Sequence, residues 1–100
     1  MIKGTTPTHT FSMPFGEEMI KAIEICYAQN GEVMLSKGIE DCTIEGNTIS
    51  VKLSQEDTLE FAEGVCVEIQ IRILTPADDA IASNVMRVHC HECLFDGVIE

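Results

Sequence analysis

The chain has 100 residues, of which 17 are acidic and six are basic, so its net charge is −11 with neutral histidines. Binding to nucleic acid or to an anionic membrane surface needs clustered Lys and Arg, and this charge argues against both partner classes. The 45% apolar content is typical of a globular protein with a core, and we expect a single domain over residues 1–100.

The sequence lacks the usual marks of a membrane or secreted protein. No apolar stretch approaches the ~18 residues that a membrane span requires, and MIKGTTPTHT has no apolar signal core. Five cysteines, an odd number at wide spacing, indicate reduced thiols rather than a disulfide scaffold. We therefore expect the protein to be made in a cytoplasm.

The first expected strand is Thr8–Phe15, with Pro14 near its end as at a sheet edge. We expect its one histidine, His9, to lie on the surface, because charged and polar side chains are mostly exposed. Arg72, on a later strand, is expected at the surface for the same reason.

The stretch AIEICYAQNGEVMLSK predicts a hairpin. A three-residue loop, Gln29–Gly31, pairs Tyr27 with Val33. The same loop pairs Ile25 with Leu35, so that the apolar side chains of both strands share one face. A two-residue loop, Asn30–Gly31, would pair Tyr27 with Met34 and put these side chains on opposite faces, and we therefore expect the longer loop.

A second hairpin is predicted by EDCTIEGNTISVKLS, with a two-residue loop at Gly46–Asn47. This loop places Ile44 opposite Ile49. It also places Cys42 opposite Val51, so the apolar faces agree without a bulge. Cys42 is then expected to face the core.

The segment SQEDTLEFAEG predicts a short helical turn between two strands. Ser54 can cap it, and the acidic residues of its first turn are explained by the helix dipole. Gly64 lies past its end. Leu59 and Phe61 are expected to close one end of the core.

Strict alternation makes Val65–Leu74 the clearest strand. Its inward side chains are expected to be Val65, Val67, Ile69, Ile71 and Ile73. The turn TPADD then leads into a last strand, Ala80–Cys90, which completes a third hairpin. The more apolar face of this last strand is expected to hold Ala80, Ala82, Met86, Val88 and Cys90.

These elements add up to an all-β fold. We expect an immunoglobulin-like antiparallel β-sandwich of about seven strands with one short helical turn. Cys26 and Cys66 lie on strands that could carry the usual immunoglobulin disulfide. Alternation places both on the polar faces of their strands, so we expect no disulfide between them.

The stretch VHCHEC near the C-terminus is rich in metal-ligand types. On a strand, His89, His91 and Cys93 share one face, and together they could form a three-ligand zinc site. A structural zinc site needs a fourth ligand, which no second Cys-x-x-Cys supplies. Cys90 and Cys93 form a lone C-x-x-C without the helix N-terminus that activates redox thiols. The alternative is the end of a strand followed by a polar tail, LFDGVIE.

Several stretches together resemble a known group of proteins. They are KGTTPTHTF, YAQNGEVMLSK, TISVKLSQEDTLEF, VEIQIRILT, AIASN and DGVI, and the resemblance covers Gly4 to Ile99. In this order they resemble the small prophage-encoded immunoglobulin-like structural proteins of Gram-positive bacteria, which are similar to the N-terminal domain of phage baseplate upper proteins. The resemblance implies a tail or baseplate component that contacts other phage structural proteins or its own copies. Such a protein is made in the bacterial cytoplasm and belongs to the virion once assembled.

The expected function is therefore a non-enzymatic structural or accessory role through protein–protein contacts, with no cofactor. No nucleophile elbow and no glycine-rich phosphate loop is visible, and the resemblance supplies no catalytic residues. VHCHEC departs from the strand end usual in that family. A zinc-binding module is the first alternative. A carbohydrate-binding sandwich is the second, although one Tyr, four Phe and no Trp leave little aromatic platform.

Overall fold

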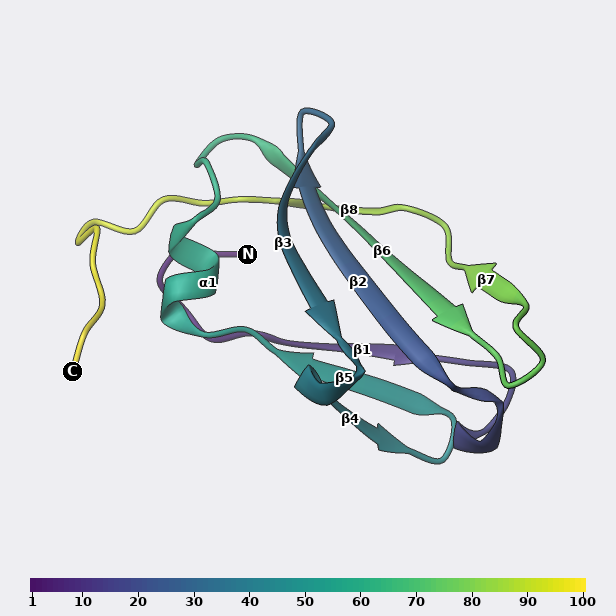
Figure 1. The fold of residues 1–100 in the computed structure, drawn as a ribbon. Coiled ribbons are helices and arrows are strands. Elements are labelled where there is room, and N and C mark those ends of the chain that lie inside the picture. The colour runs from purple at the N-terminus through teal and green to yellow at the C-terminus, as the bar shows by residue number, and fades with distance from the viewer.

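Eight strands form two antiparallel sheets in the computed structural model, which describes residues 1–100 (Figure 1). The strands are β1 (Thr8–Ser12), β2 (Ala22–Gln29), β3 (Glu32–Gly38), β4 (Cys42–Glu45), β5 (Thr48–Lys52), β6 (Cys66–Leu74), β7 (Ala80–Ala82) and β8 (Met86–His89). The helical segments are η1 (Glu17–Met19), η2 (Ile39–Asp41) and α1 (Gln55–Leu59). No helix of the structure is long and apolar enough to cross a membrane.

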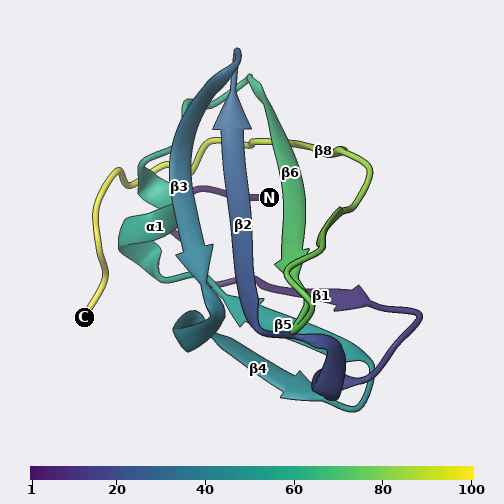
Figure 2. The same cartoon turned by 45° about the vertical axis from the view of Figure 1, so that its right-hand side comes forward.

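The small sheet has the order β1-β5-β4, and the large sheet has the order β3-β2-β6, with β7 and β8 both paired to β6. Figure 2 shows the large sheet standing over the small one. The order is that of an immunoglobulin sandwich whose small sheet has three strands. The expected all-β antiparallel sandwich with one short helical turn is confirmed.

The last predicted strand is interrupted, which raises the strand number to eight. Ala82 pairs with Arg72 and Met86 pairs with Ile69, so the three residues 83–85 lie opposite only two residues of β6. This extra residue is a bulge, held where the Ser83 hydroxyl accepts a hydrogen bond from the Ile71 amide at 3.2 Å. The prediction of one uniform apolar face is wrong, because the bulge turns Ala80 and Ala82 to the outer side.

The first hairpin differs from its predicted register. Gln29 pairs with Glu32 around the two-residue loop Asn30–Gly31, whose φ angles are 52° and 78°. Both angles are positive, as in the tight turns that Asn-Gly favours. The prediction of a three-residue loop is wrong. A bulge next to Tyr27 shifts the register by one, and Tyr27 then pairs with Leu35.

The second hairpin and the capped turn are as predicted. Cys42 pairs with Val51 and Ile44 with Ile49. At α1, the Ser54 hydroxyl accepts a hydrogen bond from the Asp57 amide at 3.1 Å, and the Ser54 amide donates to Asp57 Oδ2 at 2.9 Å. This reciprocal capping explains why a five-residue helix forms here.

Thirteen buried apolar side chains form one core between the two sheets. Four of the five predicted inward side chains, Val67, Ile69, Ile71 and Ile73, are buried. The fifth, Val65, lies just before β6 and is only half-buried. Phe61 closes one end of the core as expected, whereas Leu59 is only half-buried and Thr58 is buried in its place. The Thr58 hydroxyl donates to the Thr5 carbonyl at 2.8 Å, so a polar side chain is satisfied there.

The first residues of the chain run parallel to the end of the last strand, which the sequence did not indicate. Ile2 forms a parallel bridge with His91. The α-ammonium of Met1 donates to the His89 carbonyl at 2.9 Å, and the Lys3 amide donates to the His91 carbonyl at 3.0 Å. These bonds cover the free edge of the strand at residues 89–91, which include two of the predicted metal ligands, His89 and His91.

Candidate functional site

The structure brings two of the three predicted zinc ligands together. The rings of His89 and His91 lie edge to face, with centroids 4.5 Å apart, so the expected common face is confirmed for this pair. The Cys93 thiol instead contacts the Phe95 carbonyl at 3.1 Å. No group of three or more His, Cys, Asp or Glu side chains in residues 1–100 is arranged to hold a metal ion. The three-ligand site stays a prediction.

Cys66 is a further thiol near the histidine pair that sequence reasoning did not connect with it. It is exposed and is the cross-strand partner of His89 on the outer face of the large sheet. Cys26 lies on the outer face of the same sheet, and both thiols are free, as are the other three cysteines. Pairing between β6 and β8 is long-range, so no spacing in the sequence points to the neighbourhood of Cys66 and His89.

His9 points inward between the two sheets and is half-buried, so the expectation of an exposed surface position is wrong for this residue. Its Nδ1 is 2.8 Å from the hydroxyl of Tyr27, which is fully buried, and the bond joins β1 to β2 across the two sheets. Burial, with the nearby α-ammonium, lowers the pKa of His9, and burial raises the pKa of Tyr27. A phenol of raised pKa keeps its proton, so this pair satisfies a buried hydroxyl. His9 and buried Phe11 are two residues apart on β1 and therefore share one face, and this spacing is the signal that could have placed His9 inward.

A second polar pair holds α1 against the large sheet. The Lys37 ammonium lies 2.9 Å from Asp57 Oδ2, and the two side chains are only 18% and 17% exposed. Burial by itself raises the pKa of Asp57, but hydrogen bonds from Ser54 and Lys37 hold it below the ordinary value. This carboxylate therefore stays ionised and joins β3 to the capped turn, which is a structural role.

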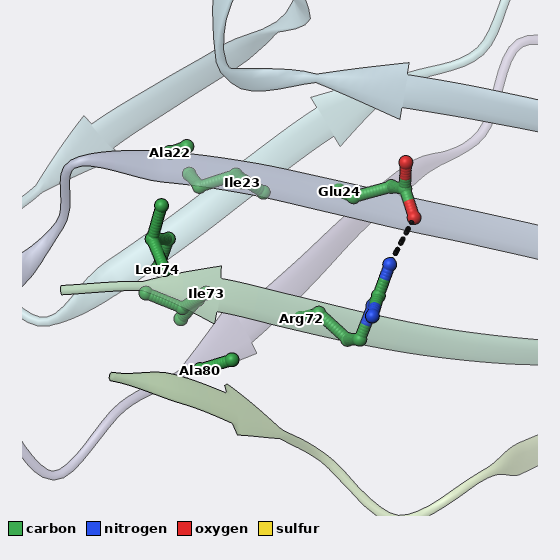
Figure 3. A pocket seen from close by; sticks show the side chains of 7 residues that line it. All are labelled: Ala22, Ile23, Glu24, Arg72, Ile73, Leu74 and Ala80. Atoms are coloured by element: carbon green, nitrogen blue, oxygen red, sulfur yellow. Dashed lines mark hydrogen bonds and ion pairs between the residues drawn. The ribbon is translucent and has the colours of Figure 1, made fainter. Parts of the chain in front are cut away.

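The outer face of the large sheet is the broadest candidate for an interaction surface. Its carboxylates are paired across strands: Glu24 with Arg72 at 2.9 Å, and Glu68 with Arg87 at 3.0 Å. Figure 3 shows Glu24 and Arg72 reaching toward one another from β2 and β6, and both are exposed, as expected for Arg72. Two open hollows of ≈ 300 and ≈ 390 Å³ lie on this face.

Between these ion pairs the face carries Gln70 and several small or apolar side chains. Ala28 and Cys26 lie on β2, and exposed Val33 and Val85 rise beside them, with exposed fractions of 58% and 40%. Burial and the neighbouring Glu24 carboxylate raise the pKa of Cys26, so its thiol stays protonated and is not an activated nucleophile. This arrangement suits contact with another surface better than chemistry.

The outer face of the small sheet has a different character. It is made mainly of hydroxyl side chains: Thr8, Thr10, Ser12, Thr43, Thr48 and Ser50. Two of them, Thr10 and Ser50, form a hydrogen bond of 3.1 Å across the strands. Such a face is well hydrated and gains little from being covered.

The C-terminal tail is apolar and exposed, in contrast to the polar tail expected from the sequence. Leu94, Phe95 and Ile99 are exposed, and Gln55 of α1 holds the tail through two hydrogen bonds to the backbone of Ile99 at 3.1 and 2.9 Å. Phe95 is also the one largely exposed aromatic side chain.

Comparisons of this chain with protein-family models, with curated proteins and with solved structures found no match. The resemblance to prophage structural proteins therefore stays a prediction.

Proposed function

We propose that this protein is a non-enzymatic structural or accessory component of a phage particle, of the tail or baseplate type, and that it acts through protein–protein contacts. The resemblance of its sequence stretches supports the phage assignment. The observation that supports the mode of action is the outer face of the large sheet, where the two carboxylates are paired and the side chains between them, apart from Gln70, are small or apolar.

A face of this kind is suited to binding for a physical reason. Its charges already have partners, so covering it leaves no carboxylate without a counter-charge. Seven residue pairs between β2 and β6 make the backbone of this face rigid. Little conformational entropy is therefore lost on contact. Single exposed apolar residues are common on protein surfaces. Val33 and Val85 are not isolated in this way, because both border the same hollow.

The test is the location of the protein after prophage induction in its source bacterium. Particles are purified on a density gradient, and the protein is quantified by mass spectrometry against the tail proteins. We expect a constant ratio to the tail proteins across the particle fractions. Recovery of the protein only in the particle-free fractions would contradict the proposal.

Zinc binding is a second candidate, favoured by the contact between the rings of His89 and His91. We expect about one Zn²⁺ per chain in tag-free protein, with Cys93 or water completing the ligands. Elemental analysis of the wild type, of His89→Ala with His91→Ala, and of Thr10→Ala as the control measures this. A metal content that is zero, or equal in all three proteins, would rule it out.

A further inference from the structure

We propose that two copies of this chain dimerise through the outer faces of their large sheets, about a two-fold axis that passes across Cys26 and Gln70. The axis lies in the plane of the interface and runs across the strands. The β6 strand of one copy therefore stacks on β6 of the other and runs in the opposite direction. This inference deepens the proposed function, because it names one partner of the interaction surface as a second copy of the chain.

Charge restricts where a second copy can approach. Each chain has a net charge of −11, so two copies repel one another. Most of the 17 acidic residues have no ion-pair partner, but on this face Glu24 and Glu68 are each paired with an arginine. A second copy therefore meets no unpaired negative charge here.

The pattern of charge along β6 is complementary to itself. Glu68 and Arg72 share the outer face and stand two residues to either side of Gln70, roughly 7 Å from it along the strand. A two-fold rotation at Gln70 exchanges their positions. Arg72 of one copy then lies over Glu68 of the other, and the reverse contact forms at the same time. An isologous dimer needs this kind of self-complementarity.

Of the two side chains at the axis, Cys26 is small. Gln70 is longer, and its Nε2 donates a hydrogen bond to the Ser83 carbonyl of its own chain at 3.0 Å. Cys26 is the cross-strand partner of Gln70, so the two Cys26 side chains meet where the axis crosses β2. Ala28 pairs with Glu68 and Glu24 pairs with Arg72, so the same rotation places Glu24 over Ala28 of the other copy. Contact at these positions is not blocked by bulk. Packed sheets keep their strands within about 30° of one another, so the register can hold along the strand.

The size of the face is enough for a modest dimer. Four strands about 4.8 Å apart and a β6 of nine residues give roughly 600 Å² per copy, or about 1,200 Å² in total. That total is at the lower limit of specific interfaces, so we expect a dimer that dissociates on dilution. The outer face of the small sheet is shorter and hydroxyl-rich, and it offers no comparable surface.

The first test is the mass of the protein in solution, by light scattering and sedimentation from about 1 to about 200 µM. We expect the wild type to move from monomer to dimer over this range. Cys26→Lys places two like charges at the axis and should stay monomeric. Ser50→Lys makes the same charge change on the middle strand of the small sheet, and it should dimerise like the wild type. A monomeric wild type, or a Cys26→Lys dimer, would overturn the inference.

The second test does not depend on the folding of Cys26→Lys, because it uses exposed Arg72 and half-exposed Glu68. Arg72→Glu places carboxylate against carboxylate in the dimer, and Glu68→Arg places guanidinium against guanidinium. Each variant alone should be monomeric. Mixed in equal amounts they should form a heterodimer, because both contacts of the axis are then of opposite charge. A mixture that stays monomeric would overturn the proposed axis.

The two proposals can fail separately. A monomeric wild type that still enters phage particles would leave the proposed function intact and remove the dimer. A stable dimer found only in the particle-free fractions would remove the proposed function and leave the dimer.

Discussion

The outer faces of the two sheets follow the same rule of alternation and yet differ in chemistry. On the small sheet the outward positions carry Thr and Ser, as in the hydrogen bond between Thr10 and Ser50. On the large sheet they carry Ala, Cys and the cross-strand ion pairs. Hydroxyls are best satisfied by water, whereas paired charges and small apolar groups can be covered at little expense. A side chain that points away from the core is therefore not necessarily one that favours contact with solvent.

The first prediction checks that the difference between the sheets is confined to their outer faces. Ile71 of the large sheet and Ile49 of the small sheet are both buried in the shared core. Ile71→Ala and Ile49→Ala should each lower the free energy of unfolding by about 3 kcal/mol, through lost apolar burial and the cavity left behind. Urea denaturation followed by circular dichroism measures this. A biphasic transition, or a loss in only one variant, would show that the two sheets are not one cooperative unit.

The second prediction separates ion pairs that hold the fold from those that shape the surface. Lys37→Met leaves the half-buried Asp57 carboxylate without its counter-charge and should cost about 2 kcal/mol of unfolding free energy. Lys21→Met removes an exposed pair and should cost at most about 0.5 kcal/mol. Arg72→Met, on the outer face, should leave the urea midpoint of the monomer unchanged. A large loss of stability in Arg72→Met would mean that the outer pairs are structural.

The third prediction concerns pH and the histidine between the sheets. Because the folded state lowers the pKa of His9 from 6.5, its proton binds better to the unfolded chain. The stability that neutral His9 contributes is complete above pH 6.5 and is lost as the pH falls through the lowered folded value. The urea midpoint of the wild type should therefore fall on acidification over this window, and that of His9→Gln should fall less. Equal slopes in the two proteins would contradict this assignment.

The smallest expected effect is on the outer face of the small sheet. Ser50→Ala removes the hydrogen bond to Thr10, and such cross-strand pairs contribute roughly 0.5 kcal/mol. The variant should stay close to the wild type in both its urea midpoint and its mass in solution. A change in association would show that the hydroxyl face takes part in contact, and would break the contrast between the two faces.

Much of the fold could be predicted from local patterns. The buried face of β6, the register of the Gly46–Asn47 hairpin and the cap at Ser54 depend on residues close together in the chain, and all three are confirmed. The predicted register of the first hairpin was wrong. Alternation alone requires a three-residue loop to bring the apolar side chains onto one face, but a two-residue loop with a bulge beside Tyr27 pairs Tyr27 with Leu35. Bulges have no dependable sequence signature, so a register with one extra residue escapes pattern reasoning.

The candidate surface could be predicted only in part. Alternation placed Cys26, Cys66 and Arg72 outward, and it put His89 and His91 on one face. It did not indicate that Arg72 meets Glu24, since these residues are 48 positions apart and their strands pair through the tertiary fold. It also missed the contact between His9 and Tyr27, because that bond crosses from one sheet to the other.

By itself, the sequence determined the class of fold, the faces of β6 and of the second hairpin, and the capped turn, because each depends on the period of the side chains or on bonds within a few residues. Only the tertiary structure decided which strands lie side by side, and hence that carboxylates and arginines alternate across the outer face of the large sheet. It also decided that the bulge before β8 turns Ala80 and Ala82 outward. The physical reason is that pairing between distant strands is chosen by the packing of the whole core, and no local pattern records it.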